Sequence, residues 1–146
     1  MTDDQYFAGT KVAIAKEKVA GALRKCAVPV QVVLLVDSAQ GIIDNGGLRY
    51  FYEVDFEEQG PYSDFVEAYR AIGAEDAATL LERSIRLFPF PDPHLHELKR
   101  QRWLDQIQED ESHEFNYISA KLIGHQVVFP KLKEYMARHW EHFVAT

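Results

Sequence analysis

The sequence predicts an all-α protein, a single compact bundle of seven to eight helices of unequal length. Apolar residues recur at helical spacing in most segments, and glycines and prolines stand between those segments. No segment offers a strand with which the one strand-like run could pair its backbone. At 146 residues the chain has the length of one domain, so we expect residues 1–146 to form a single all-helical domain.

The first helix is predicted over residues 10–27. Its apolar face is expected to carry Val12, Val19, Leu23 and Cys26, which follow one another at steps of seven, four and three residues. Lysines and an arginine occupy the other face. Pro29 is expected to end this helix, because proline disfavours helical geometry in the residue before it.

The run Val30–Val36 is open to two interpretations. Taken alone it is typical of a buried strand, because it is rich in β-branched residues. The alternative is a helix from Pro29 to Asp44 that is apolar nearly all round because it is buried. We favour the helix, since one strand without a partner cannot satisfy its backbone.

A pair of glycines, Gly46 and Gly47, comes after this segment and predicts a sharp turn. Asn45 is expected to adopt left-handed geometry or to cap the next helix. A short aromatic helix is predicted over Leu48–Tyr52. The glycines are therefore interpreted as a structural joint.

The rest of the chain is predicted to form further helices. They cover residues 63–72 with Gly73 as the stop, about 74–88 before three prolines, roughly 94–108, a helix capped by Ser112 that ends at Gly124, and a last helix from about Pro130. The apolar face of the last helix is expected to hold Leu132, Tyr135, Met136, His139 and Phe143.

Charge is distributed unevenly along the chain. The net charge is −7, yet residues 53–67 contain six acids and no base, and residues 103–120 contain five acids and no lysine or arginine. Surfaces of this kind repel nucleic acid and attract basic partners. We therefore expect no direct binding to nucleic acid.

Other features of the sequence predict a cytoplasmic protein. The one cysteine, Cys26, excludes an intramolecular disulfide and fits a reducing compartment. The N-terminus lacks the pattern of a secretory signal. The longest apolar run, Val32–Val36, is much too short to span a bilayer, so no membrane association is expected.

Several motifs resemble a bacterial family of all-helical domains of unknown function that includes a DNA-mimic protein. The matching pieces are Asn45-Gly46-Gly47-Leu48, Tyr50-Phe51-Tyr52, Ala68-Tyr69-Arg70-Ala71-Ile72-Gly73-Ala74, Phe88-Pro89-Phe90-Pro91, Tyr135-Met136, His139 and Phe143. They span about residues 30–143. The resemblance to this DNA mimic protein-like family implies a compact helical bundle. Its DNA-mimic member presents carboxylates where a DNA-binding protein expects phosphates.

The functional prediction is a non-enzymatic protein that binds another protein through an acidic face. The partner is expected to be basic, such as a DNA-binding regulator. The candidate residues are Glu53, Asp55, Glu57 and Glu58, with Asp110 and Glu111 as a second patch. Carboxylates at i and i+4 of a helix lie about 5–6 Å apart at Cβ, comparable with neighbouring phosphates. The alternative is a solvated face that keeps the protein soluble.

Two other functions stay open. A small metal-dependent hydrolase would use His94 and His96 with Asp92, although two residues apart on a helix the imidazoles diverge. His139 and His142 are spaced to reach one ion, but His139 falls on the apolar face. We expect no catalytic residue, metal or cofactor. A protein that neutralises a toxin is the third possibility.

Overall fold

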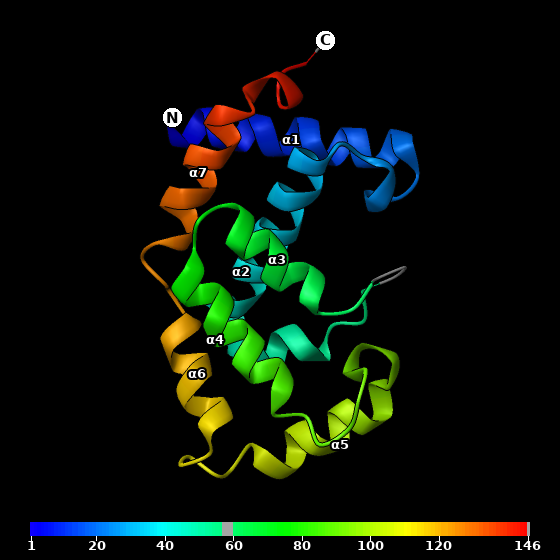
Figure 1. The fold of residues 1–146 in the computed structure, drawn as a ribbon, viewed down its shortest axis with the longest axis vertical. Coiled ribbons are helices and arrows are strands. Elements are labelled where there is room, and N and C mark those ends of the chain that lie inside the picture. The colour runs from blue at the N-terminus through cyan, green and yellow to red at the C-terminus, as the bar shows by residue number, and fades with distance from the viewer. Residues whose placement is uncertain (57–59, 146) are drawn as a thin grey trace.

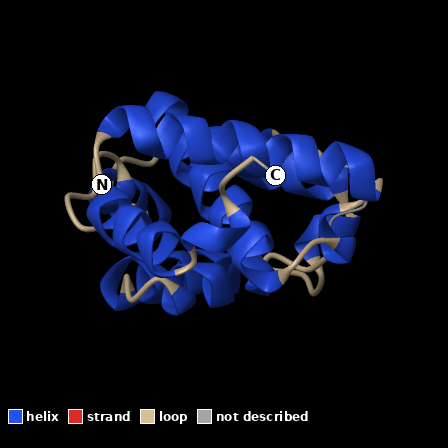
Figure 2. Ribbon diagram, turned by 90° about the horizontal axis from the view of Figure 1, so that it is seen from above, coloured by secondary structure: helices blue, strands red, loops and turns tan. Residues whose placement is uncertain are grey.

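The structure is a computed structural model that describes residues 1–56 and 60–145 (Figure 1). Within these residues it contains seven α-helices, three short 3-10 helices and no strand (Figure 2). The prediction of an all-α bundle is confirmed. The α-helices are α1 (Asp3–Ala20), α2 (Val28–Glu53), α3 (Ser63–Ala71), α4 (Glu75–Arg86), α5 (Glu97–Ile107), α6 (Glu114–Leu122) and α7 (Val128–Arg138). The 3-10 helices are η1 (Leu23–Lys25), η2 (Pro93–Leu95) and η3 (Trp140–His142).

Helix α2 is the centre of the bundle. It packs against α1, α3, α5, α6 and α7, while α3 and α4 pair with each other in front of it in Figure 1. Val33, Val36 and Ile43 are completely buried. The helical interpretation of the Val30–Val36 run is therefore confirmed. Burial on nearly all sides of α2 outweighs the modest helix propensity of its β-branched residues.

The backbone of α2 kinks at Gly47, which has φ 72° and ψ −173°. The kink directs the amide of Leu48 towards α6, where the Ser119 hydroxyl oxygen accepts its hydrogen bond at 2.9 Å. The predicted turn is confirmed at Gly47. It is wrong for Gly46 and Asn45, which stay helical, and the Asn45 amide donates to the carbonyl of Gly41 at 2.9 Å.

Gly73 ends α3 as the sequence predicts. Its φ is +87°, which is left-handed geometry that favours glycine. The amide of Gly73 donates to Arg70 O at 2.9 Å, and that of Ala74 donates to Tyr69 O at 3.0 Å. These two bonds form the Schellman arrangement, in which the carbonyls at the helix end find partners.

The first helix differs from its prediction in position and in face. It begins at Asp3, where Thr2 and Gln5 form a capping box, and it ends at Gly21 with φ 86°. Its buried face carries Tyr6, Gly9, Thr10 and Ala13. The predicted apolar face is wrong, because Val19 is 90% exposed and Leu23 and Cys26 come after the end of α1.

Three other helix boundaries differ from the prediction. The segment expected to be helical from His94 forms η2, and α5 begins only at Glu97. His113, not Ser112, caps α6, because its Nδ1 accepts the Phe115 amide at 3.1 Å. The last helix ends at Arg138, and η3 then carries the chain to the buried Phe143.

Buried polar groups connect α2, α3 and α6. The Gln40 amide donates to the carbonyl of Leu122 at 2.9 Å and to the Asp44 carboxylate at 2.7 Å. Its oxygen accepts the Tyr69 hydroxyl at 2.9 Å. The Asp44 carboxylate also accepts the Gly124 amide at 2.7 Å. Burial raises the pKa of Tyr69, so its hydroxyl stays a donor at neutral pH.

Replacing Tyr69 with phenylalanine is expected to lower the free energy of unfolding by about 1–3 kcal/mol, because the buried oxygen of Gln40 loses its donor. Denaturation by urea, monitored by circular dichroism, measures this difference. Tyr117→Phe is the matched control, since its side chain is exposed, and it should change stability by less than about 0.5 kcal/mol. Equal stability of the two variants would contradict the role of the Tyr69 hydroxyl.

No helix among the residues described is both long enough and apolar enough to cross a membrane.

Candidate functional site

The first predicted acidic patch begins at the end of α2. Glu53 lies in the last turn of the helix and accepts from Arg49 Nε at 2.7 Å, one helical turn earlier. Both side chains are about one-third exposed. Because this ion pair offsets its charge, Glu53 offers a partner less free charge than the sequence suggests.

Arg49 also connects the two acidic segments. Its guanidinium donates to Asp105 at 2.5 Å, to the carbonyl of Leu104 at 3.0 Å and to Gln108 at 2.8 Å, all in or just after α5. The hydrogen bond to Asp105, together with that to Glu53, raises the pKa of Arg49 despite partial burial. The structure thus brings the end of α2 beside α5 through a residue that the sequence analysis missed.

Beyond Glu53 the chain carries carboxylates that form no ion pair within residues 1–56 and 60–145. Asp55 is exposed, as are Asp64 and Glu67 on α3. Burial, with the charge of Glu67, raises the pKa of Asp64, while His94 lowers it. Glu57 and Glu58 lie outside the described residues.

The second predicted patch lies in the turn between α5 and α6. Asp110 accepts the Ser112 hydroxyl at 2.6 Å and the Ser112 amide at 3.1 Å, and these bonds lower the pKa of Asp110. Its carboxylate is therefore charged at neutral pH and held in place by the turn. Glu111 beside it is exposed, and in the described part of the chain neither residue forms an ion pair.

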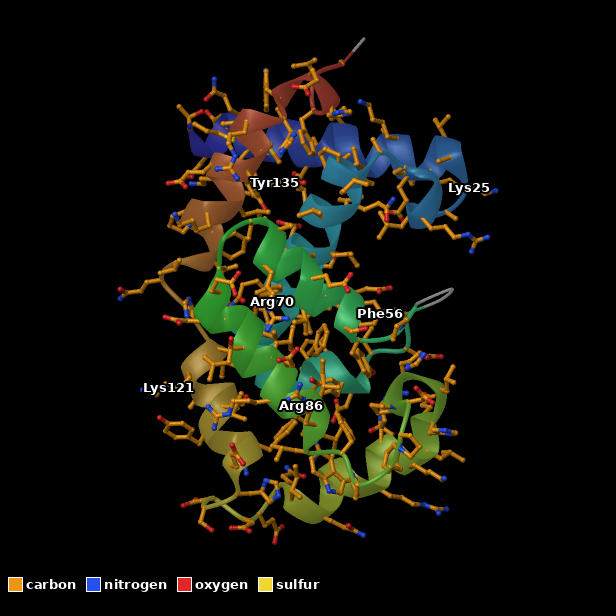
Figure 3. The ribbon with its side chains drawn as sticks, viewed as in Figure 1. Lys25, Phe56, Arg70, Arg86, Lys121 and Tyr135 are labelled. Atoms are coloured by element: carbon orange, nitrogen blue, oxygen red, sulfur yellow. The ribbon has the colours of Figure 1, made fainter. Side chains whose placement is uncertain are left out.

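The face formed by α3 and α4 contrasts with these patches, because it also carries arginines that pair with Glu75 and Glu82. Glu82 lies between Arg70 at 3.3 Å and Arg86 at 3.7 Å, and Glu75 also reaches Arg70 at 3.5 Å. Figure 3 shows Arg70 and Arg86 on this face. Pairing separates Glu75 and Glu82 from the exposed Asp55, Asp110 and Glu111, which form no ion pair within the described residues.

The histidines of the hydrolase alternative do not converge. His94 packs edge-on against Tyr62 with ring centroids 6.2 Å apart, whereas His96 packs against Phe90 at 6.1 Å. Asp92, the third member of that set, has left-handed geometry with φ 50°. Among the described residues, no three histidine, cysteine or carboxylate side chains are grouped to hold a metal ion.

His139 and His142 lie at the end of the bundle. His139 ends α7 and packs against the ring of Tyr135, with centroids 4.5 Å apart. The carbonyl of His142, in η3, accepts from Lys16 Nζ at 2.7 Å. The expectation that His139 lies on the apolar face is confirmed in part, because the side chain is half-buried and lies just past the helix.

The geometry defines a class, the all-helical bundle with a kinked central helix. Within that class, the sequence model of the family described as DMP19-like protein matches residues 25–139, and the chain therefore belongs to this family. The resemblance predicted over about residues 30–143 is confirmed. The matched region includes the Gly47 kink and the Gly73 stop. No curated protein and no solved structure matches the chain.

Proposed function

We propose that this protein binds a DNA-binding protein through carboxylates that occupy the positions of DNA phosphates. The acidic face consists of Glu53, Asp55, Glu57, Glu58, Asp110 and Glu111. Membership of the DMP19-like family supports the DNA-mimic role. The observation that carries the assignment to these patches is that Asp55, Asp110 and Glu111 are exposed without an ion pair in the part of the chain described.

Free carboxylates matter because mimicry requires uncompensated charge. A basic groove that binds DNA gains affinity from releasing counterions and from pairing with phosphates. A carboxylate already paired with arginine, such as Glu82 with Arg70, contributes little to such a groove. Asp110 is preorganised as well as charged, since its turn fixes the carboxylate before a partner arrives.

Binding should compete with duplex DNA. The tagged protein is used to capture partners from a lysate of its source organism, and each captured protein is purified and tested for binding to duplex DNA. Added duplex should release the partner, and raising salt from about 50 to 200 mM should weaken the complex steeply. A captured protein that does not bind DNA, or that duplex does not displace, would contradict mimicry. If the protein instead neutralises a toxin, the captured toxin should not be displaced by duplex DNA.

Three charges of the face are removed in the triple variant Asp55→Asn, Asp110→Asn and Glu111→Gln. We expect this variant to bind the partner at least about tenfold more weakly, mostly because association becomes slower. Asparagine in place of Asp110 retains the oxygen that accepts from Ser112, so the turn should persist. The matched control removes the same charge elsewhere, with Asp4→Asn, Asp76→Asn and Glu97→Gln, which are likewise exposed and form no ion pair within the described residues. Surface plasmon resonance with the purified partner measures both variants.

An equal loss in the control variant would show that overall charge, and not this face, governs binding. A second variant, Glu57→Gln with Glu58→Gln, tests two further carboxylates of the proposed face, and Glu53 is left in its ion pair with Arg49. If both face variants bind as the unmodified protein does, the acidic face is not the contact surface.

A further inference from the structure

A groove of about 470 Å³ lies at the end of the bundle that holds both chain termini (Figure 1). Its walls come from the second half of α1, the start of α2 and the segment after η3. Val12, Val19, Val30 and Val144 are among the residues that line it, and its surface is mainly apolar. The volume falls within the range of about 300–1,000 Å³ that is typical of small-molecule sites.

The charged side chains of the groove are basic. Lys16 and Lys25 line it, together with His142, and its described lining contains no carboxylate. Lys16 Nζ is held at the rim by its 2.7 Å hydrogen bond to the carbonyl of His142 and retains two further donors. Lys25 is exposed, and Figure 3 shows it at the edge of the molecule near the end of α1. The net charge of the protein is −7, so a groove whose charged side chains are lysines differs in sign from the protein as a whole.

The groove also lies largely outside the family region. Helix α1 and the segment after His139 fall outside the matched residues 25–139. Helix α1 packs near Gly9 against α7 and the segment after it, where a Cβ would meet Met136 and Trp140 within 3.3 Å. Most of the groove therefore lies outside the matched residues, and the acidic face does not use it.

We propose that this groove binds a free, medium-chain aliphatic carboxylate. The hydrocarbon chain would lie against the valines, and the carboxylate would accept hydrogen bonds from Lys16 and Lys25. A neutral aliphatic molecule would leave the lysines unused, whereas a compact anion would leave the apolar walls in contact with water. An aliphatic carboxylate satisfies both surfaces.

The reactivity of a cysteine in the groove can be used to measure ligand binding. Cys26, the one cysteine in the sequence, lines the groove and is half-buried. Alkylation by iodoacetamide therefore depends on access to the groove, and decanoate below its micellar concentration should slow it in a saturable way. Burial raises the pKa of the Cys26 thiol, so the reaction is run at one fixed alkaline pH. Calorimetric titration gives the affinity independently of the thiol.

Chain length and head group provide the sharpest comparison. Each buried methylene should tighten binding about fourfold, so decanoate should bind up to about fifteenfold more tightly than octanoate. Decanol, which has the same chain without the charge, should protect Cys26 at least about tenfold less well. Equal protection by decanol, or no protection by either, would overturn the proposal. Protection by phosphatidylglycerol vesicles with none by decanoate would overturn it in favour of a membrane surface.

Two substitutions test the assignment of the residues. Val19 is 90% exposed, so Val19→Asp should leave the fold intact while its charge repels the ligand and abolishes protection. Lys25→Gln should weaken decanoate binding about tenfold and leave decanol binding unchanged. Lys18→Gln is the matched control, since Lys18 is exposed on α1 and does not line the groove. An equal loss in Lys18→Gln would show that general attraction, and not this site, holds the anion.

Discussion

Replacing Gly47 with valine should lower the free energy of unfolding by about 3–5 kcal/mol. The φ of 72° and ψ of −173° lie in a region that side chains avoid, at a cost of about 1–3 kcal/mol. A Cβ would also lie 2.7 Å from the Ser119 hydroxyl oxygen, which accepts from Leu48. The added bulk therefore disturbs the hydrogen bond that stabilises the kink. Equilibrium unfolding in urea measures the loss.

Gly41→Ala is the matched control for this substitution. Gly41 lies in the same helix with open space beside it, so alanine there should stabilise the protein by about 0.5–1 kcal/mol. Gly47→Ala should fall between the two, about 2–3 kcal/mol below the unmodified protein. If Gly47→Val folds with normal stability yet loses partner binding, the glycine is a contact residue and the structural interpretation is wrong.

Arg100→Met is expected to lower the free energy of unfolding by about 3–5 kcal/mol. Arg100 is only 1% exposed, and its guanidinium donates to the carbonyls of Tyr52 at 3.1 Å, Pro93 at 2.8 Å and His94 at 3.2 Å. Methionine fills similar space but leaves these carbonyls without a donor. The end of α2 and the η2 turn would both lose a partner. Thermal and urea unfolding should show the loss together.

Arg102→Met serves as the control, because Arg102 is exposed on the same helix, and it should change stability by less than about 0.5 kcal/mol. Arg100→Lys should recover only part of the stability. Its single ammonium group can donate to some of these carbonyls but cannot donate in both directions that the planar guanidinium spans. Equal stability of the Arg100→Met and Arg102→Met variants would show that solvent replaces the guanidinium.

The sequence was sufficient for the fold class and for most helices. Helical spacing located α3, α4 and α6 to within a few residues, because each has one buried face and a clear stop. The choice of helix for Val30–Val36 depended on the absence of a pairing strand, an argument about the whole chain. Local propensity alone favoured the wrong structure there.

The prediction of the buried face was wrong for α1, because apolar residues lie on two faces of this helix. Helix α1 exposes Phe7, Ile14 and Val19, so the spacing of its valines matched the solvent-facing side. The true core face uses Gly9 and Thr10, which carry no strong hydrophobic signal. The hydrogen bonds from Leu48 to Ser119 and from Arg100 to Tyr52 could not be found either, because these partners lie 71 and 48 residues apart in the chain.

For the candidate site, the sequence located the carboxylates but not their pairing. Glu53 and Asp110 are both acidic residues in the sequence. In the structure, Glu53 is paired with Arg49, whereas Asp110 accepts hydrogen bonds within its turn. Arg49, which joins the two acidic segments, was absent from the predicted set because it lies outside both. The i,i+4 spacing of Arg49 and Glu53 is visible in the sequence, but the Arg49–Asp105 pair joins residues that lie 56 apart in the chain, so only the three-dimensional arrangement reveals it.

The Ser119–Leu48 hydrogen bond has a consequence for the order of folding. The last turn and a half of α2 begins at Leu48, and the donor at its start finds its acceptor only when α6 has docked. A six-residue helix is too short to persist alone in water. Residues 48–53 should therefore become helical late, together with α6, and slow exchange of the Leu48 amide should report that docking. The two halves of one helix would then belong to different cooperative units.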